Sequence, residues 1–400
     1  MVFTHIAGTA VIRALGPMGV PVVALHYSSN EMGYLSRYVR QRLRVPDPKQ
    51  NELAFLERLM DLGTEFAGSL LIPTDDYTLV ALSRYKKPLQ TKYIVAAEDW
   101  TIVSQCINKQ HTYARASAIG IPCPVGFLVR SPRDLEQCQH TIGFPCVMKP
   151  CQGHGFYEVF GVKMFKITNA EELLEQYEKA SVAGTEVMVQ ELIPGGDAEG
   201  VNYNSYFVDG RPIAEFTARK VRLEPPFFGS PRAVVSRRVP EIIEPGRALL
   251  QDLKYSGFSC TEFKRDVRDG QYKLMEINCR NNRSGSLAVA CGMNFPWIMY
   301  KHLVYGDILA HAGFRENVAW IEGTSDLMRF FVSRKAERYS LREYLKPYRL
   351  EKVFAVLSIK DPFPFVQRCW YLVRLVGKNL RARLPGRKQI AKPHHSSSIG

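Results

Sequence analysis

Two carboxylates and one amide stand in two short alternating segments of the sequence, where they could hold a metal ion. Glu262 lies in the segment 260–267, and Glu276 and Asn278 lie in the segment 271–278. Opposed carboxylates repel one another unless a cation lies between them. An oxygen-only ligand set without histidine or cysteine suits Mg²⁺ with a phosphate as co-ligand, so these residues predict a metal site. Arg280, two residues further on, would add a guanidinium group that can form two parallel hydrogen bonds to a phosphate or a carboxylate.

The predicted site depends on how the chain turns between these segments. Gly270 suits the last place of a three-residue connection, 268–270, because that place needs a left-handed backbone. The pairs along the hairpin would then be Val267–Gln271, Lys264–Leu274, Glu262–Glu276 and Cys260–Asn278. A two-residue turn would shift the register by one and place Glu262 and Glu276 on opposite faces. The open alternative is a solvated hairpin face on which Glu262 pairs with Lys264.

The elements around this hairpin indicate several packed units, because 400 residues exceed one ordinary core. A strand, a turn at Gly8 and a helix open an α/β unit at residues 1–107. We assign Gly8 to turn chemistry, and Asp75 with Asp76 to capping the next helix rather than to a substrate. Mixed α+β patterns follow at 108–195 and 196–306, and a C-terminal extension occupies 307–400.

Composition and charge limit the function classes. The net charge is +14, and from Pro362 onward the chain has no acidic residue but eight basic ones, which are Arg368, Arg374, Lys378, Arg381, Arg383, Arg387, Lys388 and Lys392. The body is thus only mildly basic, and we expect no nucleic-acid partner. Nine cysteines without a Cys-x-x-Cys pair fit cytosolic thiols. No leader or membrane-spanning run is expected, so the predicted location is cytoplasmic.

Four motifs resemble the ATP-grasp superfamily, in order and in approximate spacing. They are the segments 144–150 (Phe-Pro-Cys-Val-Met-Lys-Pro), 189–196 (Val-Gln-Glu-Leu-Ile-Pro-Gly-Gly), 262–266 and 275–280. The resemblance covers residues 1–306 and is strongest to the carboxylate–amine ligase branch, which includes D-aspartate ligase and carbamoyl-phosphate-synthase-like domains. It implies an α/β plus α+β protein with a Rossmann-like pre-grasp domain and two α+β lobes that sandwich ATP.

The resemblance also implies roles for individual residues. Lys149 would contact the adenine edge and the α-phosphate, Lys109 the terminal phosphates, and Lys220 would be a third phosphate-binding lysine. Either Asp197 or Glu199 would bind the ribose. Backbone groups of the hinge segment would recognise adenine, namely Gln190, Glu191, Leu192 and Ile193.

Further roles follow from the same resemblance and from strand spacing. Arg280 and Lys220 would be the catalytic residues, and Glu262, Glu276 and Asn278 the metal ligands. Arg222 shares a strand face with Lys220 if the strand is regular, so it would join the phosphate site. Arg283 would hold the acyl oxygen or the substrate carboxylate. The loop after Lys149 would be a lid, in which we interpret His154 as a bystander.

The implied activity is an ATP-dependent ligase that joins a small carboxylate, such as an amino acid, to an amine or a thiol through an acyl phosphate. Its cofactors would be ATP and Mg²⁺, or Mn²⁺ in place of Mg²⁺. The open alternative is a non-catalytic ATP-binding or membrane-surface scaffolding protein. Residues 363–392 mix aromatic and basic side chains, which suits peripheral contact with an anionic membrane at the inner surface, or a helix packed on the body. A homodimer is a further expectation.

Overall fold

The N-terminal part of the chain is a small parallel layer. In the computed structural model the described residues are 1–151, 156–311, 313–337 and 340–383. Strands β1 (Val2–Phe3), β2 (Val22–His26) and β3 (Val39–Arg44) form one sheet, and β4 (Leu70–Leu71) pairs with β5 (Ile94–Val95). A bridge between Val2 and Ile72 joins the two sheets. Four helices flank this layer: α1 (Ile6–Leu15), α2 (Glu52–Leu62), α3 (Asp76–Arg84) and α4 (Lys86–Gln90).

Two sequence predictions in this layer can be checked directly. A side chain at Gly8 would meet the carbonyl oxygen of Phe3 at 1.5 Å, so glycine permits α1 to pack closely on β1. Asp75 closes a capping box with Thr78 at the start of α3, which confirms the capping role. The predicted turn at Gly8 is wrong, because the chain enters α1 already at Ile6 and Gly8 lies inside that helix.

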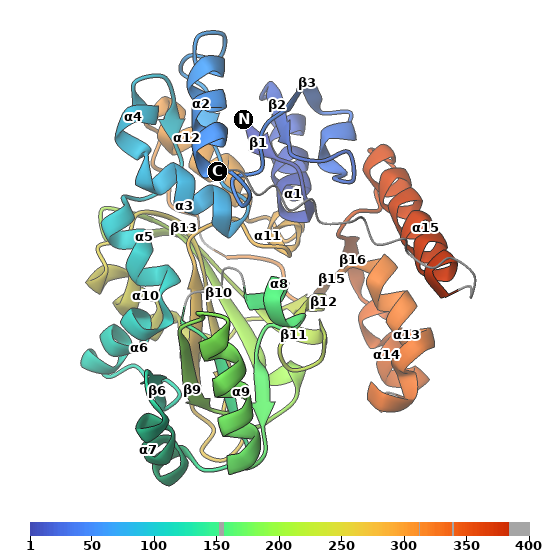
Figure 1. Cartoon of the computed structure of the whole chain (residues 1–400). Helices are drawn as coiled ribbons and strands as arrows, with labels where there is room; N and C mark the ends of the chain where they lie inside the picture. Colours follow the sequence, from blue (N-terminus) through green and yellow to red (C-terminus); the bar gives the residue numbers. More distant parts are fainter. Residues whose placement is uncertain (152–155, 312, 338–339, 384–400) are drawn as a thin grey trace, which may run out of the picture.

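The next unit is a four-stranded sheet with helices on one side, here called the first lobe. Its strand order is β6 (Gly126–Val129), β9 (Val187–Glu191), β7 (Cys146–Pro150) and β8 (Phe165–Ile167). Helices α7 (Pro132–Ile142), α8 (Phe156–Phe160) and α9 (Ala170–Val182) accompany it, and α5 (Trp100–Ile107) and α6 (Lys109–Ala118) lead into it. Figure 1 shows this lobe, in green, below the blue N-terminal layer.

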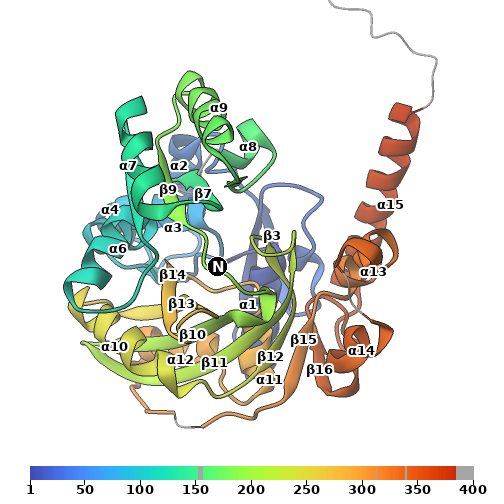
Figure 2. The ribbon, with the colours of Figure 1, turned by 90° about the horizontal axis from the view of Figure 1, so that it is seen from below.

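A seven-stranded sheet forms the largest layer, and we call it the second lobe. Its order is β14 (Tyr272–Asn278), β13 (Gly257–Arg265), β10 (Gly200–Val208), β11 (Arg211–Glu224), β12 (Ser230–Ser236), β15 (Val318–Ile321) and β16 (Glu351–Phe354). Helices α10 (Ile243–Asp252), α11 (Gly285–Ala290) and α12 (Phe295–Tyr305) pack against it (Figure 2). Strands from beyond residue 306 therefore extend the sheet that carries the predicted metal ligands.

The C-terminal part adds three helices, α13 (Gly323–Glu337), α14 (Leu341–Arg349) and α15 (Phe363–Arg383). Within the described residues, no helix is long and apolar enough to cross a membrane. All nine cysteines are free, as the sequence predicted. The division of the chain at residues 107, 195 and 306 stays a prediction.

Candidate functional site

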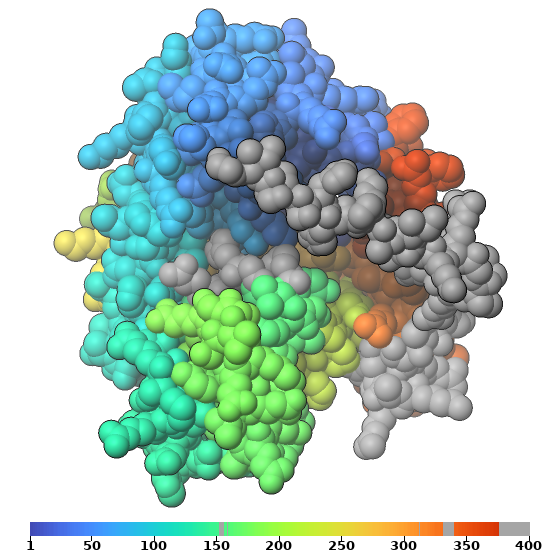
Figure 3. Space-filling view, in the orientation of Figure 1, coloured from blue at the N-terminus to red at the C-terminus, as the bar shows by residue number. Residues whose placement is uncertain are grey.

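A cavity of about 430 Å³, lined by charged and apolar side chains, lies between the two lobes. Strand ends from both sheets line it, and Asp76 at the start of α3 closes one end. Figure 3 shows the green first lobe below the blue N-terminal layer and next to the teal helices that lead into it. The cavity is lined by nearly every residue that the sequence predicted for the site, namely Lys109, Lys149, Gln190, Glu191, Leu192, Ile193, Asp197, Lys220, Glu262, Glu276, Asn278 and Arg280.

The hairpin β13–β14 places Glu262 directly opposite Glu276 and Cys260 opposite Asn278, as predicted. The predicted turn is nevertheless wrong. Asp266 donates its N–H to the carbonyl of Gln271 at 2.8 Å, so four residues connect the strands rather than three. Gly270 does adopt the left-handed backbone, with φ of +78°.

A second irregularity compensates for the longer turn. The register shifts between the pairs Glu262–Glu276 and Phe263–Leu274, which leaves Met275 as an extra residue in β14. Lys264 consequently faces Lys273, and not Leu274 as predicted. The bulge returns the two carboxylates to the same face, so the predicted pairing holds for a different reason.

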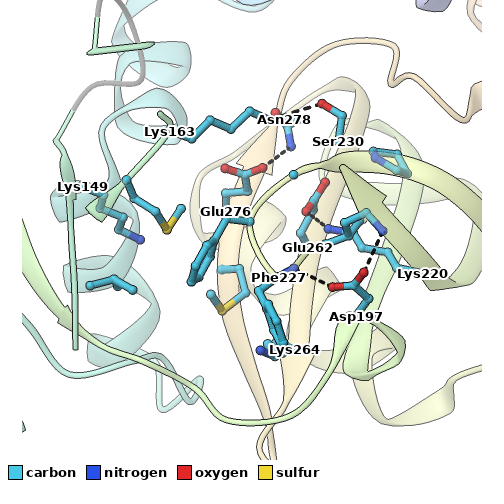
Figure 4. Close-up of a pocket in the computed structure, with 18 of the residues that line it drawn as sticks. Lys149, Lys163, Asp197, Lys220, Phe227, Ser230, Glu262, Lys264, Glu276 and Asn278 are labelled. Atoms are coloured by element: carbon cyan, nitrogen blue, oxygen red, sulfur yellow. Dashed lines mark hydrogen bonds and ion pairs between the residues drawn. The ribbon is translucent and has the colours of Figure 1, made fainter. Parts of the chain in front are cut away.

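Each of the two carboxylates has a lysine beside it, and Figure 4 shows the one that pairs with Glu262. Glu262 forms an ion pair with Lys220, and Glu276 Oε2 lies 3.9 Å from Lys109 Nζ. The alternative pair of Glu262 with Lys264 does not form, since Lys264 donates to the carbonyl of Ile193 at 2.8 Å. Burial raises the pKa of Glu276, but the ammonium groups of Lys109 and Lys220 outweigh it and lower the pKa overall, so Glu276 is an anion.

Asn278 completes an oxygen set with the two carboxylates. Its Nδ2 donates to Glu276 Oε1 at 3.3 Å, and its Oδ1 accepts from Arg280 Nη2 at 3.1 Å. No three His, Cys, Asp or Glu side chains gather as a metal cluster within the described ranges. Two carboxylates and an amide oxygen nonetheless suit a hard divalent ion whose other ligands are water and phosphate, so the donor set fits Mg²⁺.

Lys149 lies on the opposite wall of the cavity, in β7, and is only 4% exposed. Its ammonium donates to Tyr113 Oη at 2.9 Å, and Tyr113 donates in turn to the carbonyl of Met275 at 2.6 Å. Burial, assisted by the charge of Lys109, lowers the pKa of Lys149 to about 7. A buried ammonium without a carboxylate partner favours an anionic ligand, because that ligand restores its charge.

The two candidates for the ribose acid have other partners. Asp197 lines the cavity, but its carboxylate accepts the backbone N–H groups of Leu223 and Phe227 at 2.8 and 2.7 Å. Glu199 does not line the cavity, and it lies 3.8 Å from Arg265. Asp197 therefore fixes the connection between β11 and β12, and the choice of ribose ligand stays a prediction.

The hinge segment, which comprises β9 and the residues after it, contains one buried polar side chain. Gln190 is 1% exposed, and its Nε2 atom has no hydrogen-bond partner among the residues that the structure describes. Glu191 instead forms ion pairs with Arg268 and Lys273 on the hairpin, which tie the first lobe to the second.

Arg222 is the clearest error among the sequence predictions. β11 bulges at Val221, so that Lys220 pairs with Val234 and Arg222 pairs with Ala233, which puts the two cations on opposite faces. Arg222 is 1% exposed and holds Asp326 through two hydrogen bonds of 2.8 Å. It is a structural residue rather than a phosphate ligand.

Several cavity residues escaped the sequence analysis. Asp76 holds the guanidinium of Arg280 from a different part of the chain. Lys163 also lines the cavity and donates to Ser230 Oγ at 3.3 Å. A lysine on an irregular loop has no local signal, whereas the Asp75-Asp76 pair at a strand end was visible and was assigned to capping alone. His154 and most of the predicted lid lie outside the described residues.

These features define the ATP-grasp fold, with a cavity between two α+β lobes. The biotin carboxylase domain of Hydrogenobacter thermophilus 2-oxoglutarate carboxylase, in complex with MgADP and bicarbonate, has a TM-score of 0.63 and 17% identity over 79% of this chain and 71% of that chain. The match supports the fold that the motifs predicted.

Among curated proteins, the relatives are ligases. D-aspartate ligase of Enterococcus faecium is 28% identical over 261 residues, which are 62% of this chain and 61% of the relative. D-alanine–D-alanine ligase of Methylococcus capsulatus is 30% identical over 214 residues, which are 50% of this chain and 64% of the relative. The chain thus spans somewhat less than two thirds of these relatives. No family model matches the sequence.

Proposed function

We propose that the protein is an ATP-dependent carboxylate–amine ligase with Mg²⁺ as its metal. The observation that carries the proposal is the pair Glu262–Glu276 with Asn278, facing buried Lys149 across one cavity. Relatives named D-aspartate ligase and D-alanine–D-alanine ligase, and a structural neighbour in complex with MgADP, support it.

In this proposal the protein mainly positions charged side chains around the phosphates of ATP. Glu262, Glu276 and Asn278 would hold Mg²⁺, which supplies charge neutralisation at the phosphates when it is bound. Lys109, Lys149 and Lys220 would bind the phosphate oxygens, and the backbone of residues 190–193 would read the adenine. Lys220, which pairs with Glu262, has three N–H donors and would share them between that carboxylate and the phosphate.

The reaction we infer has two displacements. An oxygen of the substrate carboxylate attacks the γ-phosphorus, the bond to the bridging oxygen of ADP breaks, and an acyl phosphate forms. An amine then attacks the acyl carbon, phosphate leaves, and the amine loses a proton. Arg280, which Asp76 holds, would stabilise the charge on the transferred group or the acyl oxygen. Arg283, also at the cavity wall, is the proposed ligand for the substrate carboxylate.

The substrates we propose are an amino acid or a similar small carboxylate together with an amine, with a thiol acceptor as the variant. The test incubates the full chain with Mg-ATP and pooled amino acids and measures ADP, AMP and phosphate. ADP release that depends on one amino acid, with a new C–N bond found by mass spectrometry, is the expected result. AMP release would instead indicate adenylation.

The competing function is a non-catalytic ATP-binding or scaffolding protein. It predicts ATP binding without any ADP release, and identical behaviour of the Glu276→Gln variant. The ligase proposal predicts that Glu276→Gln abolishes turnover, whereas Glu175→Gln, which removes an exposed ion pair with Lys179 on α9, retains it. A homodimer stays a separate proposal, for which light scattering of the full chain is the test. Contact of residues 363–392 with an anionic membrane is likewise proposed.

A further inference from the structure

Helix α15 carries a stripe of exposed apolar side chains, which we call the outer face. It consists of Phe363, Val366, Trp370 and Val373, which are 61%, 58%, 55% and 63% exposed. Their spacing of three and four residues puts them on one side of the helix. Single exposed apolar residues are ordinary, but a continuous stripe that includes tryptophan marks a contact surface.

Other side chains in the first turns of the helix contact the body. Phe365 packs against the main hydrophobic core, and Gln367 donates to the carbonyl of Ser29. Arg368 Nε lies 4.0 Å from the buried carboxylate of Glu322. In Figure 2, α15 projects beside α13 with its far end clear of the other elements. The outer face is therefore not covered by the described part of the chain.

The turn that precedes the N-terminus of α15 is held by one buried carboxylate. Asp361 is 1% exposed and accepts from Arg13 Nε and Ser36 Oγ at 2.8 Å each and from the N–H of Arg37 at 2.9 Å. Three donors on one carboxylate leave the preceding turn little freedom. The outer face is thus held in a set direction relative to the N-terminal layer.

The charge on and after this face has one sign. After Asp361 the sequence contains eight basic residues and no acidic one. Arg374 lies 5.4 Å from the ring centroid of Trp370, at the edge of the outer face. Aromatic and aliphatic side chains beside arginines suit the boundary between headgroups and acyl chains of an anionic bilayer, where tryptophan and arginine each find their preferred environment.

We propose that the outer face binds the surface of an anionic lipid bilayer. Val366 and Val373 contribute nothing to binding a phosphate backbone, which argues against nucleic acid. A second copy would present the same basic segment and no acidic complement to it, which argues against a second copy. The inference does not depend on the ligase proposal, because it uses no cavity residue.

The experiment is flotation of the full chain with vesicles of phosphatidylcholine alone and of phosphatidylcholine mixed with phosphatidylglycerol. The expected result is binding to the mixed vesicles, and a loss of at least about tenfold in the triple variant Val366→Ser, Trp370→Ser, Val373→Ser, because each removed apolar side chain weakens insertion. The matched control is Val182→Ser on α9, a 91% exposed valine far from α15, which should bind as the original does.

Equal flotation of the triple variant and the unchanged chain, or equal binding to neutral vesicles, would overturn the proposal. A dimer that the triple variant converts to a monomer, without vesicle binding, would identify a second copy as the occupant and also overturn it. All three substituted side chains are exposed, so the melting temperature should be unchanged.

A second measurement separates insertion from mere adsorption. The tryptophan emission of the full chain should shift to the blue on mixed vesicles, and the shift should vanish in Trp370→Phe, which retains an aromatic ring and should still float. Floating without any blue shift in the unchanged chain would contradict burial of the outer face in the bilayer.

Discussion

The guanidinium of Arg280 is held by Asp76, with Nε to Oδ1 at 2.6 Å and Nη2 to Oδ2 at 3.1 Å. The two residues lie 204 positions apart, in the second lobe and in the N-terminal layer. Arg280 also donates to Asn278, so Asp76 orients both a metal-ligand candidate and a catalytic candidate. Its role is thus that of a positioning residue at the end of the cavity.

We predict that Asp76→Asn lowers kcat by about 100-fold, because a misplaced cation loses transition-state stabilisation. The Kd for Mg-ATP should change little, since Asp76 acts on Arg280 and not on the nucleotide. Steady-state kinetics with a binding titration separate the two. The control is Glu52→Gln, which removes the exposed ion pair with Arg84 in the same layer; a similar loss there would contradict the prediction.

Lys149 should make stability depend on pH. Its pKa is lowered to about 7 in the folded protein from 10.5, so the unfolded chain binds the proton more tightly. The destabilisation is complete below pH 7 and disappears as the pH rises to 10.5. We therefore predict that Lys149→Met raises the free energy of unfolding near pH 7 and that the gain shrinks toward pH 10.5, as urea titrations can measure.

The same residue should couple ATP binding to protonation. A phosphate beside Lys149 restores its ordinary pKa, so binding above pH 7 should take up a proton. Calorimetry in buffers of different ionisation enthalpy measures that uptake. It should be absent in Lys149→Met, whose ATP affinity should fall by about tenfold or more. Uptake that persists in the variant would assign the proton to another group.

Gly270→Ala tests the turn of the hairpin. The φ of +78° costs an alanine about 1 kcal/mol, although the added methyl group would meet no atom closer than 3.7 Å. Chemical denaturation should show that loss. Gly196→Ala serves as the comparison, because its φ of −77° suits alanine and no atom lies within 4 Å. Equal stability of the two variants would mean that the turn relaxes.

Asp326→Ala tests the buried network around Arg222. Asp326 is 0% exposed, and its removal leaves Arg222 without its two-bond acceptor and Tyr348 without the acceptor of its hydroxyl. We expect a loss of about 3 kcal/mol or more. Glu175→Gln, which removes an exposed pair with Lys179, should cost less than about 0.5 kcal/mol.

Side chains alternate between the two faces of a strand, and this alternation was enough to predict the site where a strand is regular. It was also enough where two irregularities compensate for one another. The pairing of Glu262 with Glu276 was predicted, yet a four-residue turn and the bulge at Met275 produce it together. A single bulge at Val221 was enough to make the prediction for Arg222 wrong. An extra residue in a strand leaves the apolar pattern nearly unchanged, so the sequence alone does not reveal it.

Contacts between residues far apart in the chain also could not be predicted from the sequence. The link between Asp76 and Arg280 depends on how the N-terminal layer sits on the second lobe, and no spacing in the sequence reports it. The family motifs, by contrast, are local. They correctly predicted the fold and named residues that converge on one cavity, because each motif lies at a strand end or at the helix start next to it.

Asp361 also bears on how the chain matures during synthesis. Its carboxylate accepts hydrogen bonds from Arg13, which lies 348 positions earlier in the chain, and from Ser36, which lies 325 positions earlier. A ribosome that has made the N-terminal layer must add most of the remaining chain before these donors meet their acceptor. Until then the N-terminal layer lacks this anchor, and the donors of Arg13 and Ser36 have no Asp361 carboxylate to bind.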